Sequence, residues 1–173
     1  MADGESLGRP QADAEAILLA LAGGDVRFLV AGGLAVQAHG YGRVTLDVDI
    51  IPRPDTENMT RLAAVLRDLD TAAVDDRGNR LPLDTSHPES LALGNYFLTT
   101  RFGALDLFNG PRPDLKAWTR LDEAAIEVTL SGTTIRFIGK DDLLRMKREA
   151  GREKDLADIA ALTELDEASN QDG

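Results

Sequence analysis

The segment that most constrains this chain is TLDVDII, residues 45–51, which combines the apolar residues of a buried strand with two carboxylates. Because side chains alternate between the two faces of a strand, Asp47 and Asp49 share one face while Val48 and Ile50 point into a core on the other. Two neighbouring carboxylates raise each other's pKa unless a cation lies between them. The pattern therefore predicts a site for a hard divalent cation, Mg²⁺ or Mn²⁺, which prefers oxygen ligands.

The composition is that of one globular domain. The chain has 173 residues, of which 43% are hydrophobic, and this is enough for a single core. No apolar run approaches the roughly 20 residues that span a bilayer, and the N-terminus shows no signal-peptide pattern. The absence of cysteine excludes disulfides and thiol chemistry, and two histidines disfavour a structural zinc site. We expect a cytoplasmic protein that makes no membrane contact.

The formal net charge of −11 restricts the class of partner. Proteins that hold nucleic acid by attraction to its backbone need a basic footprint, so this charge argues against that class while leaving room for a local basic groove. Acidic surface that keeps the protein soluble explains most of the charge.

Hydrophobic periodicity predicts an α/β (or α+β) chain, with a small mixed sheet, helices packed on it and a C-terminal helical segment. Helices are expected at 11–22, 34–39 and 56–69, a short helix or loop near Trp118, and strands at 26–31, 45–51, 96–100, 104–108, 126–130 and 133–138. Residues 71–90 are polar and rich in turn residues, which predicts a long irregular connection. Asp141 is expected to cap a helix that is interrupted near Gly151 and resumes to Leu165.

These elements divide the chain into four parts. Residues 1–10 form a flexible tail, 11–138 the core, 139–165 the C-terminal helical segment, and 166–173 a second flexible tail. The sequence contains no internal repeat and no low-complexity segment.

Two further features could meet the Asp pair in space. Gly32 and Gly33 end a strand and open a helix, where backbone N–H groups can approach a phosphate, although such a pair can also simply end a strand. Asp106 is a single acid inside the apolar run ALDLF, and a neighbouring strand would place it beside Asp47 and Asp49. Three acids can bind two metal ions, with the third carboxylate as general base or shared ligand.

A basic cluster follows near the C-terminus. This cluster could neutralise the charge of a triphosphate, and it consists of Lys147, Arg148, Arg152 and Lys154. They could equally interact with helix ends and with nearby acids such as Asp155. In the same way, Arg43 could reach a phosphate or neutralise the Asp pair.

Together these motifs resemble the nucleotidyltransferase superfamily of the DNA polymerase beta type, whose pattern is Gly-Gly or Gly-Ser, a spacer, and Asp-hydrophobic-Asp. The string from His39 to Asp49 and the C-terminal motif are similar to a small bacterial branch that includes the AbiEii and MenT toxins of type IV toxin–antitoxin systems. That C-terminal motif comprises Lys147, Arg152, Lys154, Asp155 and Asp158. The resemblance covers about residues 26–165.

The resemblance implies a nucleotidyltransferase fold and transfer of a nucleoside monophosphate from an NTP to an acceptor, with release of pyrophosphate. It places Gly32 and Gly33 on the nucleotide phosphates and Asp47, Asp49 and Asp106 on the metal. It also assigns nucleotide contacts to Arg43, Lys147 and Arg152, with Asp155 completing the site. One departure is that Gly33 lacks the hydroxyl of the Gly-Ser form and offers only its backbone.

By the same resemblance the acceptor is an RNA 3′ end such as that of tRNA, which would make the protein a growth-inhibiting toxin with a cognate antitoxin. A protein hydroxyl or a small molecule such as an antibiotic is the alternative acceptor. The chain could also be a non-catalytic nucleotide-binding or antitoxin-partner module, but the intact Asp47 and Asp49 pair argues against both.

Overall fold

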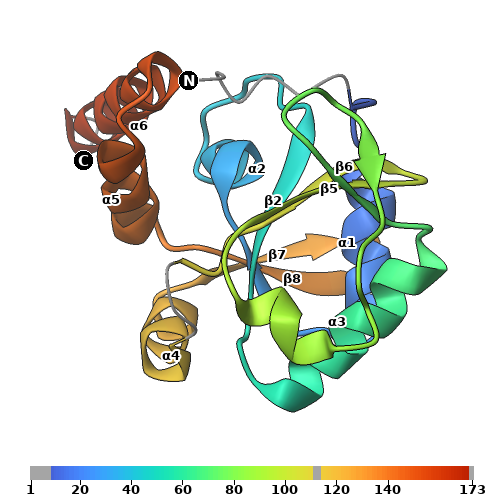
Figure 1. Ribbon diagram of the computed structural model, residues 1–173. Helices are drawn as coiled ribbons and strands as arrows, with labels where there is room; N and C mark the ends of the chain where they lie inside the picture. The colour runs from blue at the N-terminus through green and yellow to red at the C-terminus, as the bar shows by residue number, and fades with distance from the viewer. Residues whose placement is uncertain (1–8, 111–113, 172–173) are drawn as a thin grey trace.

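The described residues, 9–110 and 114–171, contain one eight-stranded mixed sheet in the computed structural model (Figure 1). The strand order is β4-β3-β5-β6-β2-β1-β8-β7, and at its centre β2 runs parallel to β6 and antiparallel to β1. The strands are β1 (Phe28–Val30), β2 (Asp47–Pro52), β3 (Ala72–Val74), β4 (Arg80–Leu81), β5 (Tyr96–Thr100), β6 (Gly103–Leu107), β7 (Ile126–Leu130) and β8 (Thr133–Phe137).

α1 and α3 lie on one side of this sheet, and α2, α5 and α6 lie on the other (Figure 1). α1 packs against α3 and the strands β2 and β8, whereas α5 packs against α6 and α2. The helices are α1 (Ala14–Gly23), α2 (Gly32–Ala38), α3 (Thr56–Asp68), α4 (Leu115–Glu123), α5 (Lys140–Ala150) and α6 (Glu153–Gln171), with a 3-10 helix, η1, at Pro88–Ala92.

The core follows from the apolar spacing of the sequence. Asp55 caps α3 by accepting a hydrogen bond from the Asn58 backbone N–H at 3.0 Å, and Leu62 and Leu66 of that helix are completely buried. On β2, Val48 and Ile50 are also completely buried. The opposite face of β2 is therefore left for its two aspartates, as the alternation of the sequence predicted.

The expected mixed sheet with helices on it is confirmed, including the hairpins β5–β6 and β7–β8. The long irregular connection expected over residues 71–90 is wrong in part, because β3 joins the sheet beside β5 and pairs with β4. These strands are too short for a periodic signal. Asp75 makes the turn between them by accepting hydrogen bonds from the backbone N–H groups of Arg77 and Asn79.

The C-terminal helices differ from the prediction at their ends. Gly139, not Asp141, is the N-cap of α5, and a Cβ at Gly139 would overlap the Ala124 carbonyl oxygen. The interruption near Gly151 is confirmed, and this residue has a left-handed backbone with φ of 62°. α6 continues through Gln171, so residues 166–171 of the expected tail are helical. Within the described ranges, no helix combines the length and the apolarity needed to cross a membrane.

Candidate active site

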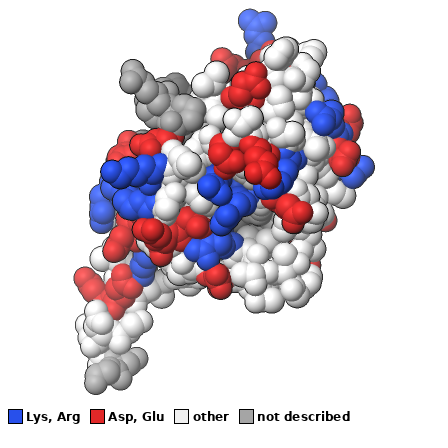
Figure 2. All heavy atoms as spheres, turned by 90° about the horizontal axis from the view of Figure 1, so that it is seen from below, with Lys and Arg blue, Asp and Glu red and all other residues white. Residues whose placement is uncertain are grey.

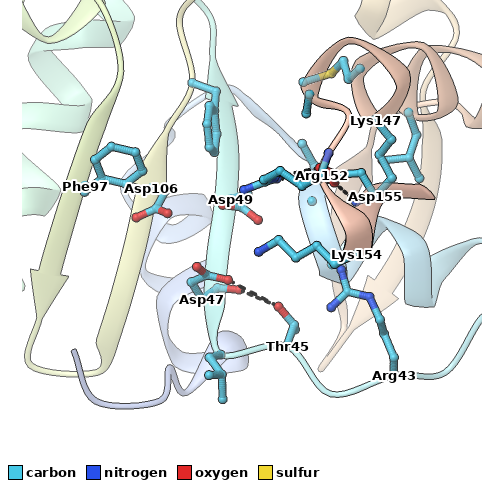
Figure 3. Close-up of a pocket in the computed structure, with 18 of the residues that line it drawn as sticks. Arg43, Thr45, Asp47, Asp49, Phe97, Asp106, Lys147, Arg152, Lys154 and Asp155 are labelled. Carbon is cyan, nitrogen blue, oxygen red and sulfur yellow. Dashed lines mark hydrogen bonds and ion pairs between the residues drawn. The ribbon is translucent and has the colours of Figure 1, made fainter. Parts of the chain in front are cut away.

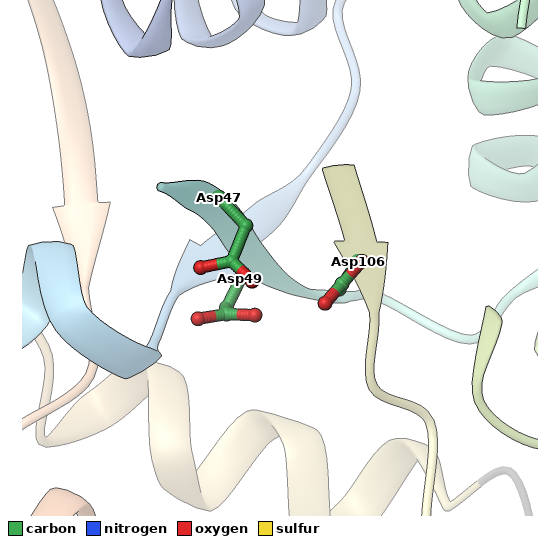
Figure 4. Close-up of side chains that lie close together, drawn as sticks. All are labelled: Asp47, Asp49 and Asp106. Atoms are coloured by element: carbon green, nitrogen blue, oxygen red, sulfur yellow. The ribbon is translucent and has the colours of Figure 1, made fainter. Parts of the chain in front are cut away.

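Three aspartates from two adjacent strands meet on one face of the sheet (Figure 4). Asp47 and Asp49 lie on β2, and Asp106 lies on the parallel strand β6 directly opposite Asp49. One carboxylate oxygen from each residue lies within 4.8 Å of the others. The structure thus brings together the three acids that the sequence singled out, and we call them the acidic cluster.

The electrostatics of the acidic cluster favour a bound cation. Burial, followed by the negative charges of Asp47 and Asp106, raises the pKa of Asp49 to about 7. Burial also raises the pKa of Asp106 to about 6, while the Arg9 guanidinium partly offsets this effect. A divalent cation would lower both pKa values, because it replaces lost solvation and screens the carboxylates from each other.

The donor set fits Mg²⁺ or Mn²⁺. All three ligands are carboxylate oxygens, the atoms that hard cations select. Asp47, Asp49 and Asp106 would therefore hold the ion, which when bound would supply positive charge to the three carboxylates.

Arg9 is a site residue that the sequence analysis missed, since it assigned residues 1–10 to a loose tail. Residues 1–8 lie outside the described ranges, but the Arg9 side chain is only 4% exposed. Its guanidinium donates to both carboxylate oxygens of Asp106 and to the Leu98 carbonyl oxygen at 2.9 Å. It also lies 3.7 Å from an Asp47 carboxylate oxygen. No motif in the sequence pointed to this cation.

Facing the acidic cluster is a wall built from α5, α6 and the loop before β2, which we call the basic wall (Figure 3). The Lys147 ammonium lies 3.1 Å from Asp155 and 2.8 Å from Asp158, and all three side chains are buried. Arg43 donates two hydrogen bonds to the Asp158 carboxylate, at 2.7 and 2.9 Å. Lys147 therefore has nearby acidic partners, one of the alternatives that the sequence left open. Arg43 instead pairs with Asp158, an acid outside the Asp47 and Asp49 pair.

Asp155 is the centre of this wall. It accepts hydrogen bonds from the Arg152 backbone N–H at 3.2 Å and from the Arg152 side chain at 2.7 Å. Burial alone would raise the pKa of Asp155, but hydrogen bonds from Arg152 and Lys147 outweigh burial and lower that pKa. Lys154, the neighbouring residue, extends towards Asp47 and Asp49 (Figure 3), and its charge lowers the pKa of Asp49.

The two walls enclose a cleft of about 770 Å³. The cleft is large enough for a small-molecule substrate, since such pockets have volumes of about 300–1,000 Å³. The basic residues Arg43, Lys147, Arg152 and Lys154 lie on one side of the acidic cluster, while Phe97 lies beside Asp106 on the other (Figure 3). Every site residue that the sequence predicted lines the cleft: Gly32, Gly33, Arg43, Asp47, Asp49, Asp106, Lys147, Arg152 and Asp155.

The two glycines are required by close packing around the aspartates. Gly32 begins α2 with φ of 58°, and a Cβ there would overlap the Asp49 carboxylate. A Cβ at Gly33 would come within 2.6 Å of the Thr45 hydroxyl oxygen. A side chain at either position would therefore disturb the β2 end of the site.

No protein-family model matches the sequence, and no curated protein matches it significantly. Solved structures do share the architecture. An antigenic nucleotidyltransferase-like protein from Paracoccidioides brasiliensis is 18% identical over 91% of this chain and 79% of its own, with a TM-score of 0.53. A candidate nucleotidyltransferase from Thermotoga maritima is 15% identical over 90% of this chain and 89% of its own, with a TM-score of 0.52.

The antibiotic-resistance factor ANT(2'')-Ia is also similar, with 15% identity over 86% of this chain and 80% of its own and a TM-score of 0.54. At these identities the likeness concerns the fold. The chain therefore has the fold of these nucleotidyltransferase-like structures, a mixed sheet flanked by helices.

Proposed function

We propose that the protein is a metal-dependent nucleotidyltransferase, which moves a nucleoside monophosphate from an NTP to an acceptor hydroxyl and releases pyrophosphate. The observation that carries this proposal is the juxtaposition in one cleft of the acidic cluster and a basic wall. A metal–triphosphate complex needs both, because its cation requires oxygen ligands and its phosphates require positive charge. The fold of the similar solved structures supports the same class of reaction.

In this reaction the acceptor oxygen forms a bond to the α-phosphorus, and the bond from that phosphorus to the bridging oxygen breaks. Pyrophosphate leaves with the electron pair, and the hydroxyl proton passes to a carboxylate of the cluster and then to water. Asp47, Asp49 and Asp106 would hold Mg²⁺ or Mn²⁺, which when bound would neutralise phosphate charge and lower the pKa of the attacking hydroxyl.

The remaining residues orient the nucleotide. Gly32 and Gly33 offer backbone N–H groups to the phosphates at the start of α2. Arg152 and Lys154 are exposed in the cleft and supply positive charge to the triphosphate. Lys147 is buried against two carboxylates, so its part is to fix the wall that carries these cations. Catalysis of this kind depends on positioning and electrostatic stabilisation.

For the acceptor we propose an RNA 3′ end such as that of tRNA, which would make the protein a toxin with a cognate antitoxin. The support is the resemblance of the Arg43–Asp49 string and the Lys147–Asp158 motif to the AbiEii and MenT branch. The face seen in Figure 2 carries acidic and basic side chains intermixed, rather than one extended basic patch. A short contact with an RNA end suits this surface better than a long duplex would.

A hydroxyl group of an antibiotic is the second candidate acceptor. The observation that favours it is the similarity in fold to the antibiotic-resistance factor ANT(2'')-Ia. The overall charge of −11 also favours a small cationic acceptor over a polyanion.

The test is a transfer assay with each α-³²P-labelled NTP and Mg²⁺ or Mn²⁺. Total tRNA, a protein extract and a panel of antibiotics are offered as acceptors in parallel. Labelled tRNA is the expected product, and labelled antibiotic would favour the second candidate. No labelled product with any acceptor, while the protein binds NTP and metal, would overturn the enzymatic proposal.

A further inference from the structure

Arg9 makes an unusual contact with the acidic cluster, because its guanidinium occupies one side of the proposed metal site. It donates to both oxygens of Asp106 and lies 3.7 Å from an Asp47 oxygen. A planar guanidinium binds a carboxylate in this two-pronged way and carries its charge at every physiological pH. Arg9 and a divalent cation would therefore compete for the carboxylates of the acidic cluster.

The backbone that carries Arg9 is fastened to the two strands of the acidic cluster. The Ala12 N–H donates to the Leu46 carbonyl oxygen at 2.9 Å, next to Asp47. The Asp13 N–H donates to the Phe102 carbonyl oxygen at 2.7 Å, at the turn before β6. The segment also packs so closely on Gly103 that a Cβ there would approach the Gln11 carbonyl oxygen to 2.6 Å. Arg9 is therefore a fixed part of the site.

The environment of Arg9 indicates that a contribution to folding stability is only a small part of its role. Its Nε is buried and has no hydrogen-bond partner among residues 9–110 and 114–171. A buried ion pair generally recovers little more than the cost of removing its charges from water, and an unsatisfied donor adds to that cost. Apolar residues that replaced Arg9 and Asp106 together would fill the same space at lower cost, whereas loss of Arg9 alone leaves Asp106 buried without its partner.

We propose that Arg9 is a built-in counter-ion that limits the binding of divalent cations by the acidic cluster. This inference rests on the metal-binding part of the proposed function. Of the three negative charges that the ionised carboxylates carry, Arg9 offsets one by direct contact. Arg9 also holds both oxygens of Asp106, so it competes with the cation for that carboxylate.

The test is the binding of Mn²⁺ without nucleotide, measured by electron paramagnetic resonance and by calorimetry. Arg9→Gln removes the charge, and we expect this variant to bind Mn²⁺ about tenfold more tightly than wild type or to take up a second ion. Arg9→Lys keeps the charge without the two-pronged geometry and should lie between the two. Arg101→Gln is the matched control, because Arg101 is exposed and lies 5.2 Å from the Phe102 ring.

Thermal unfolding shows whether the variants fold, and it adds a second readout. Without Arg9 the carboxylates repel each other, so Arg9→Gln should be less stable than wild type in EDTA and gain more stability from Mn²⁺. Equal or weaker Mn²⁺ binding by folded Arg9→Gln would overturn the inference and leave the proposed function standing. Failure of both proteins to bind Mn²⁺, even with NTP present, would overturn the inference and the proposed function together.

Discussion

Asp49 and Asp106 occupy partner positions on two adjacent parallel strands, β2 and β6. This register places two carboxylates side by side although 57 positions of sequence separate residue 49 from residue 106. Without a metal ion the two ionised carboxylates repel each other, and the charge of Asp106 is one cause of the raised pKa of Asp49.

Asp49→Asn should abolish nucleotidyl transfer while the protein remains folded. Asparagine keeps the shape of the side chain but removes a charged metal ligand, so we expect a loss on the order of 100- to 1,000-fold in transfer rate. In EDTA the variant should unfold at a higher temperature than wild type, because the repulsion is relieved. Asp68→Asn, an exposed change on α3, is the charge-matched control. Full activity of Asp49→Asn would show that the metal assignment is wrong.

Gly32→Ala should damage the site from the backbone side. Gly32 has φ of 58°, and an added Cβ would overlap the Asp49 carboxylate. The left-handed backbone alone costs about 1–2 kcal/mol for alanine, and displacement of Asp49 should weaken Mn²⁺ binding in addition. Gly42→Ala is the control, since a Cβ there meets no described atom within 4 Å. Unaltered stability and Mn²⁺ affinity in Gly32→Ala would contradict the packing argument.

Lys147→Ala should destabilise the fold. It leaves Asp155 and Asp158 buried without the ammonium that lies within 3.1 Å of both. Removing one member of a buried ionic network typically costs about 3–5 kcal/mol, which urea denaturation would measure. The neighbouring residue supplies the control, because Arg148 is exposed and Arg148→Ala should change the free energy of unfolding by less than about 0.5 kcal/mol. If the two variants had similar free energies of unfolding, Lys147 would instead have a direct role at the triphosphate.

Lys154→Ala should weaken nucleotide binding. The Lys154 side chain is exposed in the cleft and extends towards Asp47 and Asp49 (Figure 3). Loss of one charge-assisted contact with a phosphate should raise the Kd for NTP about tenfold. Binding of a fluorescent NTP analogue measures this Kd, and Lys116→Ala on α4 serves as the control. Equal Kd values for Lys154→Ala and wild type would remove Lys154 from the triphosphate site.

The sequence predicted the parts of this site that follow from local periodicity. The alternation of TLDVDII was sufficient to place Asp47 and Asp49 on one face, because the side-chain period of a strand is fixed. The pairing of β6 with β2 depends on long-range contacts, so the sequence could nominate Asp106 but could not give its register. Arg9 had no local signal, since only the folded chain brings it to residues 89 and 97 positions away.

The stability of the metal-free protein should fall as the pH rises from about 4 to 7. Asp49 has an ordinary pKa of 3.8, which the folded state raises to about 7, so between these values the folded protein binds more protons than the unfolded chain. The free energy of unfolding therefore decreases with pH across this window. Asp155 has the opposite sign, because its pKa is lowered, and its contribution is lost only as the pH falls through that lowered value.

Thermal unfolding in EDTA at pH 5 and pH 8 isolates the first effect, because Asp49 and Asp106, whose raised pKa values act in the same direction, titrate in this range while Asp155 stays ionised. Wild type should unfold at a lower temperature at pH 8 than at pH 5. Mn²⁺ should raise the unfolding temperature at pH 8 again, because it supplies the missing positive charge. In Asp49→Asn the change between pH 5 and pH 8 should be smaller, with the part due to Asp106 remaining. A wild-type unfolding temperature that is equal at both pH values, or a profile that Asp49→Asn leaves unaltered, would show that Asp49 ionises without cost in the metal-free fold. The acidic cluster would then have no electrostatic need for a cation.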